Sequence, residues 1–286
     1  MPYWIRQKKY CSPRSQKASH ALSFIDLPDH RIHYAISGAK AAPVLVLSNS
    51  LGTNFSTWDP QLPEFEKYFR VLRYDTRGHG ESAVSPGPYA FDQLGGDVVH
   101  LLDALKIARA CFCGLSMGGM TGLWLGLAAA NRLSKLIVAS TSVKFANADT
   151  WNTRIAAVRA NGMPAVAAAI VERWFTSEFR ARDPEKVRAT QKMLEMSPPE
   201  GYVACCAALR ESDMRESVAA IRIPTLVISG AQDPVSPPSD GRFLAEKISG
   251  AKYVELEGAH LVNVEAASEF TTSVVAFLGA EGDGYG

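Results

Sequence analysis

Residues 114–119 have the sequence GLSMGG, which is the strongest indicator of the fold class. It follows an apolar run at 109–115 that is typical of a buried strand, and it opens a helical pattern at 119–130. Between a strand and a helix, Gly-x-Ser-x-Gly forms a nucleophile elbow, a tight turn that holds the serine in a strained backbone conformation. Glycines flank Ser116 because side chains there would collide with the neighbouring strand and helix. The turn lifts the hydroxyl above the carboxyl edge of a parallel sheet, where the helix N-terminus favours a developing anion. We therefore predict that Ser116 is a nucleophile.

A serine hydroxyl needs a base to remove its proton. His260 lies in a loop directly after the last strand pattern, at 252–256, and therefore at the carboxyl edge of the sheet. Asp233 follows the strand pattern at 225–229, and the chain order Ser, Asp, His is the order that accompanies this elbow. We predict that His260 is the general base and that the Asp233 carboxylate orients the imidazole and stabilises the imidazolium.

Five other histidines are expected to have no catalytic part. His100 falls within a helical pattern, His20 lies near the N-terminus, and His30 and His33 adjoin the N-terminal strands, which we expect to place them far from the carboxyl edge. His79 belongs to the run DTRGHGES at 75–82, which is similar to a tight structural loop of α/β hydrolases. We predict a structural role for His79 because it does not fit the triad order.

The oxyanion hole of such a site combines two backbone N–H groups. One belongs to the residue after the nucleophile, Met117. The other comes from the loop after the strand pattern at 43–49, and Leu51 is our candidate there.

Strand and helix patterns alternate along most of the chain, which predicts a doubly wound, mostly parallel sheet. Several strand patterns are continuous Val/Ile/Leu runs, as in strands that are buried on both faces. Helical patterns include 91–105 and 264–278. The strand patterns lie at 31–37, 43–49, 70–75, 109–115, 135–140, 225–229 and 252–256.

The alternation stops between about residues 145 and 215, where the sequence is helical in character. Pro164, Pro184 and the pair Pro198 and Pro199 are expected near the starts of successive helices. We predict an inserted helical cap at 145–215 on a core formed by 23–144 and 216–286.

Residues 1–22 are basic and lack acidic side chains. They contain no apolar core of the kind that a secretory signal needs. We expect a disordered extension or an expression artefact, with an organellar transit peptide as the alternative.

The composition excludes several classes of partner. The net charge of +1 does not favour nucleic acid, and no apolar run approaches the roughly 18 residues of a membrane-spanning helix. The five cysteines are odd in number and unsystematic in spacing, which favours a cytoplasmic protein without disulfides. No nucleotide fingerprint or metal-ligand spacing is present, so we expect no cofactor and no metal. The sequence leaves the oligomeric state open.

Three segments together resemble the 3-oxoadipate enol-lactonase family of α/β hydrolases: NSLGT at 49–53, the elbow at 114–119, and TWNTR at 150–154. The resemblance extends over the chain from about residue 23. It implies hydrolysis of a small anionic enol-lactone to a keto-diacid in aromatic catabolism, the β-ketoadipate pathway. Trp151 and Arg154 are the candidates for binding the substrate carboxylate, with Arg159 and Arg173 as weaker ones. The Ser50-Leu51 pair departs from the His-Gly pair common in this fold.

Other activities share these motifs. A carboxylesterase or perhydrolase would prefer neutral esters, and a carbon–carbon bond hydrolase would need a larger aromatic slot. An acyltransferase would pass the acyl group to an alcohol or thiol, whereas a dehalogenase is disfavoured because it would have aspartate in place of Ser116. A ligand-binding protein that retains a hydrolase shell is the alternative from a different class.

Overall fold

The computed structural model describes residues 21–279, in which eight strands form one sheet. The strand order is β1-β2-β4-β3-β5-β6-β7-β8, and all neighbours pair in parallel except β1 with β2 and β2 with β4. The predicted mostly parallel sheet is therefore confirmed. The strands are β1 (Ala21–Asp26), β2 (Arg31–Ser37), β3 (Val44–Ser48), β4 (Arg70–Tyr74), β5 (Ala110–Leu115), β6 (Leu133–Ala139), β7 (Thr225–Gly230) and β8 (Lys252–Leu256).

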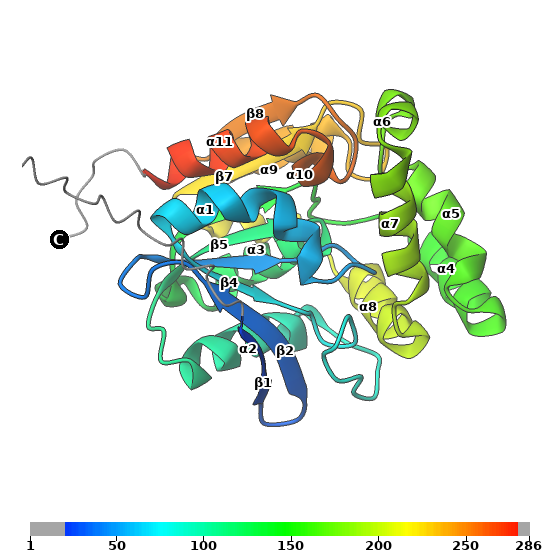
Figure 1. Ribbon diagram of the computed structural model, residues 1–286, viewed down its shortest axis with the longest axis horizontal. Coiled ribbons are helices and arrows are strands. Elements are labelled where there is room, and N and C mark those ends of the chain that lie inside the picture. Colours follow the sequence, from blue (N-terminus) through cyan, green and yellow to red (C-terminus); the bar gives the residue numbers. More distant parts are fainter. Residues whose placement is uncertain (1–20, 280–286) are drawn as a thin grey trace, which may run out of the picture.

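Helices cover both faces of this sheet (Figure 1). One face packs against α1 (Leu62–Tyr68) and α11 (Ala267–Leu278), which contact each other. The other face packs against α3 (Met117–Ala128) and α9 (Pro238–Lys247), and α2 (Phe91–Ala104) lies against α3. The central strands β5 and β7 are buried along their whole length, which explains their continuous apolar sequences. No helix between residues 21 and 279 is both long and apolar enough to cross a bilayer.

Five helices follow one another between β6 and β7, all inside the predicted range 145–215, and gather at one side of the sheet (Figure 1). The prediction for the prolines is confirmed, because Pro164, Pro184 and Pro199 each open a helix. A proline at this position loses no hydrogen bond, since the first N–H groups of a helix have no partner within it. The division of the chain into a core and a cap stays a prediction. The five helices are α4 (Ala148–Asn161), α5 (Pro164–Glu172), α6 (Ser177–Arg182), α7 (Pro184–Glu195) and α8 (Pro199–Glu211).

The structure differs from the predicted elements at both ends of the described chain. Strand β1 was not predicted, and it begins two residues before the expected start of the core at 23. Because it is an edge strand with exposed Phe24 and Asp26, it lacks a continuous apolar run. The C-terminal helix is broken into α10 (Val262–Glu265) and α11 at Ala266, whose backbone is not helical (φ −110°, ψ 48°). The predicted extension otherwise lies outside the described residues, as does His20.

The expected location of His30 and His33 is wrong. Strand β2 runs antiparallel to β4, with Tyr34 opposite Tyr74, so the start of β2 lies beside the carboxyl end of β4. The N–H of Asp75 donates a hydrogen bond to the carbonyl of His33 at 2.9 Å. Both histidines thus lie at the carboxyl edge, although β4 and β3 separate β2 from the elbow strand β5.

Candidate active site

The turn between β5 and α3 has the geometry of a nucleophile elbow. Ser116 has φ 57° and ψ −112°, a conformation that non-glycine residues rarely adopt. A Cβ atom on Gly114 would lie 2.0 Å from the carbonyl oxygen of Gly118, and one on Gly118 would lie 2.3 Å from the carbonyl oxygen of Ser48. Neither position accepts a side chain, so the turn can be this tight only with both glycines.

Three side chains from three loops at the carboxyl edge meet at Ser116. The Oγ atom of Ser116 lies 2.8 Å from Nε2 of His260, and Nδ1 of His260 lies 2.8 Å from Oδ2 of Asp233. All three residues are buried, with 6% of Ser116 exposed. The arrangement lets the imidazole take a proton from the hydroxyl while the carboxylate holds the ring by its other nitrogen.

The loop after β7 holds Asp233 in one orientation. Its Oδ1 atom accepts hydrogen bonds from the N–H groups of Val235 (2.7 Å) and Ser236 (3.1 Å), and its Oδ2 atom accepts one from the Ser236 hydroxyl (2.8 Å). Burial alone would raise the pKa of Asp233, but the charge and hydrogen bond of His260, with those from Ser236, keep that pKa below its ordinary value. The sequence analysis did not single out Ser236, whose Oγ also lies 3.4 Å from Nδ1 of His260.

The two predicted oxyanion donors belong to two segments next to Ser116, the loop at 49–53 and the start of α3. The Gly118 N–H donates to the carbonyl of Asn49 at 3.0 Å, which ties the loop at 49–53 to the start of α3. Leu51 lines the same cavity as Ser116, and Met117 is the first residue of α3. The backbone N–H of Leu51 and the backbone N–H of Met117 have no hydrogen-bond acceptor among residues 21–279. Both groups are therefore available to a ligand.

A cavity of about 340 Å³ lies above Ser116 and His260. The β3 loop contributes Ser50 and Leu51 to its walls, and the loop after β7 contributes Pro234 and Val235. This volume suits a small molecule and leaves little room for a long acyl chain. The helical insertion supplies the rest of the lining: Phe145, Ala146, Thr150, Trp151, Arg154, Arg173, Trp174, Tyr202 and Leu209.

The cavity contains the predicted cation and aromatic ring. The guanidinium of Arg154 lies 5.0 Å from the centre of the Trp151 ring, and the indole N–H of Trp151 donates to the carbonyl of Phe145 at 3.0 Å. Trp151 can therefore offer a ligand its ring but not its N–H. Arg173 also lines the cavity, whereas Arg159 lines a separate groove between α4 and α8.

Tyr202 is a cavity residue that the sequence analysis missed. It belongs to α8 and is 1% exposed. Burial raises the pKa of its hydroxyl, while the charge of Arg154 and a hydrogen bond to it act in the opposite direction. The phenol is thus a neutral donor beside the guanidinium. A helical pattern alone could not show that this face of α8 turns toward Ser116.

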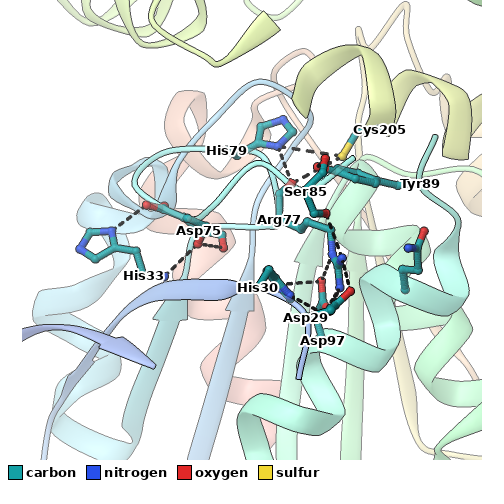
Figure 2. A network of polar contacts seen from close by, with 12 residues as sticks. Asp29, His30, His33, Asp75, Arg77, His79, Ser85, Tyr89, Asp97 and Cys205 are labelled. Atoms are coloured by element: carbon teal, nitrogen blue, oxygen red, sulfur yellow. Dashed lines mark hydrogen bonds and ion pairs between the residues drawn. The ribbon is translucent and has the colours of Figure 1, made fainter. Parts of the chain in front are cut away.

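The loop at 75–82 is the centre of a polar network that reaches β2, α2 and α8 (Figure 2). The Asp75 carboxylate contacts Nδ1 of His33 at 2.8 Å and accepts hydrogen bonds from the N–H groups of Phe55 and Glu81. His79 is fully buried, with Nδ1 3.3 Å from the carbonyl of Arg77 and 4.0 Å from Sγ of Cys205. These contacts agree with a structural role, which stays a prediction.

One group of side chains in this network has atoms close enough to ligate a metal, namely Asp29, His30 and Asp97. The Arg77 guanidinium already bonds both carboxylates, at 2.7 Å to Asp29 and at 2.6 and 2.9 Å to Asp97. An ion pair of this kind supplies the positive charge that the two carboxylates need. The group therefore anchors the loop through buried Arg77 and Asp97 and exposed Asp29 (Figure 2).

Comparisons with known proteins agree with this geometry. The sequence model of the alpha/beta hydrolase fold family matches residues 43–267. The chain is 43% identical to 3-oxoadipate enol-lactonase 2 of Acinetobacter baylyi over 91% of this chain and 97% of that protein. It is 39% identical to 3-oxoadipate enol-lactonase 1 of the same organism over the same shares. Among solved structures, the enol-lactonase from Burkholderia xenovorans LB400 superposes with a TM-score of 0.88 at 44% identity, covering 90% of this chain and 99% of that one.

Proposed function

The chain belongs to the α/β-hydrolase family, and we propose that it hydrolyses 3-oxoadipate enol-lactone to 3-oxoadipate. The observation that carries the proposal is 43% identity along nearly the whole length of a 3-oxoadipate enol-lactonase. The contact between Ser116 and His260 supports the chemistry, and the volume of the cavity above them suits a substrate of this size.

The acylation step uses the three residues that meet at the carboxyl edge. His260 takes the hydroxyl proton of Ser116 through Nε2, and Oγ attacks the lactone carbonyl carbon. The N–H groups of Leu51 and Met117 stabilise the oxyanion. The ring C–O bond then breaks, and the ring oxygen leaves as an enolate, which is a better leaving group than an ordinary alkoxide. The His260 imidazolium gives its proton to this oxygen, which forms the enol and restores the neutral ring. The Asp233 carboxylate stabilises the imidazolium while it exists.

The deacylation step releases the product from Ser116. His260 removes a proton from water, the hydroxide attacks the acyl-enzyme carbonyl, and the proton returns to Oγ as the new carboxylate leaves. The enol tautomerises to the ketone, which makes ring closure unfavourable. No cofactor takes part in this sequence.

The substrate carries a carboxylate into a cavity partly lined by apolar side chains, where an uncompensated charge is costly. Arg154 supplies the opposite charge, and the Tyr202 hydroxyl lies beside it as a second donor. The Trp151 ring packs under the guanidinium and limits its motion. The helical insertion then acts as a cap that binds the carboxylate of the substrate, while the core performs the hydrolysis.

The proposed setting is the cytoplasm, in the catabolism of aromatic compounds through the β-ketoadipate pathway. The described cysteines Cys111, Cys113, Cys205 and Cys206 are buried free thiols, which suits a reducing compartment. The small anionic lactone is the expected partner, with neither nucleic acid nor a membrane involved.

The proposal is tested by steady-state hydrolysis of the enol-lactone beside the neutral ester p-nitrophenyl acetate, with Ser116→Ala as the control. We expect a kcat/KM for the lactone at least about a hundredfold above that for the ester, because the ester lacks a carboxylate to pair with Arg154. Both activities should be lost in Ser116→Ala. A preference for the neutral ester would instead favour a carboxylesterase. Tight lactone binding without turnover would favour a binding protein.

A further inference from the structure

The segment at 173–176, between α5 and α6, bridges the two loops that deliver Asp233 and His260. The Arg173 guanidinium donates to the carbonyl of Pro234 at 3.0 Å, next to Asp233. The N–H of Leu261, next to His260, donates to the carbonyl of Trp174 at 3.0 Å. The ring of Trp174 also lines the cavity, with its centre 6.4 Å from that of His260.

The carboxylate of Glu265 joins this bridge to the other side of the histidine loop. Its Oε2 atom accepts hydrogen bonds from the N–H of Ala259 (3.1 Å) and the N–H of Thr176 (3.2 Å). Its Oε1 atom accepts one from the Thr176 hydroxyl. The same hydroxyl oxygen accepts the N–H of Phe179 at 3.1 Å and so caps α6. One side chain thereby connects the residue before His260 to the helical insertion.

The local chain does not fix the histidine loop by itself. Gly258 has φ 148°, in a region that is open mainly to glycine, so no side chain at this position restricts the backbone. The ring of His260 nevertheless has to keep Nε2 within hydrogen-bond reach of Ser116. A displacement of about 1 Å in such a pair can lower a rate by a factor of about 100. The loop therefore needs ties from outside its own backbone.

We propose that Glu265 is a positioning residue for His260, which it holds in register with Ser116 by tying Ala259 to Thr176 of the insertion. This inference rests on the proposed hydrolase function and adds a residue to it. Glu265 touches neither the substrate nor the reacting atoms. Its effect falls on the catalytic step rather than on binding, because the ties act on the His260 loop and not on Arg154.

The hydrogen bonds of Glu265 give the conservative variant a defined expectation. The carboxylate accepts three hydrogen bonds and donates none. In Glu265→Gln the amide oxygen can still accept both N–H groups, and the amide NH₂ can donate to the oxygen of Thr176. Glu265→Leu removes every acceptor at similar size. Glu265 and Glu269 both line a surface hollow between α6 and the start of α11. Glu269→Leu is the matched control, because Glu269 is exposed on α11.

The experiment measures kcat and KM for the enol-lactone and for p-nitrophenyl acetate in these three variants. We expect Glu265→Leu to lower kcat about 10- to 100-fold for both substrates with KM changed less than about threefold, Glu265→Gln to retain most of kcat, and Glu269→Leu to match the wild type. The rate of labelling of Ser116 by a fluorophosphonate should fall in parallel with kcat. Wild-type kcat in Glu265→Leu, a loss confined to KM, or equal losses in the Gln and Leu variants would overturn the proposal.

Two further variants apply if Glu265→Leu does not fold. Thr176→Val removes the hydroxyl that Oε1 accepts from, and Thr176→Ser keeps it. We expect a severalfold lower kcat in Thr176→Val than in Thr176→Ser, and equal values would contradict the role of Glu265.

The experiments distinguish failure of the proposed function from failure of the positioning role. If the wild type hydrolyses only the neutral ester, the lactone is not its substrate, but the Glu265 variants can still be compared on the ester. If the wild type hydrolyses the lactone and the Glu265 variants do so equally well, only the positioning role is wrong.

Discussion

The Nε2 atom of His260 lies 2.8 Å from Oγ of Ser116, although the two residues are 144 positions apart in the sequence. Parallel strands make this contact possible, because every β-to-α loop leaves the sheet at the same edge. Strand β5 delivers the serine, β7 the aspartate and β8 the histidine, while the insertion between β6 and β7 encloses the space above them. Under the proposed function, the core performs the acyl transfer and the insertion selects the substrate.

Arg154→Gln should separate these two roles. Losing the guanidinium removes a charge-assisted hydrogen bond, worth about 1.5–3 kcal/mol, to the carboxylate of the lactone. We expect kcat/KM for the enol-lactone to fall about 10- to 100-fold, mainly through KM, and kcat/KM for p-nitrophenyl acetate to stay within about twofold. Arg159→Gln is the control, because Arg159 lies on the same helix but lines the separate groove. Equal losses of kcat/KM for the charged and the neutral substrate would show that Arg154 does not recognise the carboxylate of the lactone.

An alanine substitution at an elbow glycine, Gly118, can be compared with one at Gly96, a glycine outside the elbow. Gly118→Ala places a methyl group 2.3 Å from the carbonyl oxygen of Ser48, so the loop that carries Leu51 has to move. Gly96→Ala places one in open space within α2, where no atom lies within 4 Å. We expect Gly118→Ala to lose nearly all activity, and Gly96→Ala to keep its activity and gain about 0.5–1 kcal/mol in the free energy of unfolding. Activity assays and urea denaturation measure both, and an active Gly118→Ala enzyme would refute the steric argument.

Burial of His79 should make the protein sensitive to mild acid. Burial lowers the pKa of His79, so the folded state holds a neutral ring. The unfolded chain binds a proton near its ordinary pKa of about 6.5, so the free energy of unfolding falls as the pH falls through that value. Between pH 7.5 and 5.5 we expect the wild type to lose about 1 kcal/mol more than His79→Asn, measured by urea denaturation. An equal loss in both proteins would show that His79 binds its proton as readily in the folded state.

The elbow and the three residues that meet there could be predicted because their signals are local. Gly114 and Gly118 flank Ser116 in the sequence, and Asp233 and His260 each follow a segment with a clear strand pattern. The parallel sheet then brings the three loops to one edge without further information. Local signals of this kind do not single out Trp151 and Arg154, which were predicted only from the resemblance to a family.

Other features depended on packing that the sequence does not display. Tyr202 reaches the cavity because of how α8 lies against α4, and the helical pattern of α8 does not say which side faces Ser116. His33 was misplaced because an antiparallel β2 reverses the edge at which its first residues lie. Glu265 lay within an expected continuous helix, and only the break at Ala266 makes it the last residue of α10. Each error concerns the direction or packing of an element rather than its existence.

We propose that Ser116 opens the lactone by forming an acyl-enzyme, and the mass of the quenched enzyme reports on this step. Because ring opening expels no fragment, acylation should add the mass of the entire enol-lactone to the protein, whereas p-nitrophenyl acetate should add only an acetyl group. We predict that wild-type enzyme quenched in acid during turnover carries the full lactone mass on the peptide that contains Ser116, and that Ser116→Ala carries none. Product formation without any adduct at Ser116, or the same adduct on Ser116→Ala, would contradict the account.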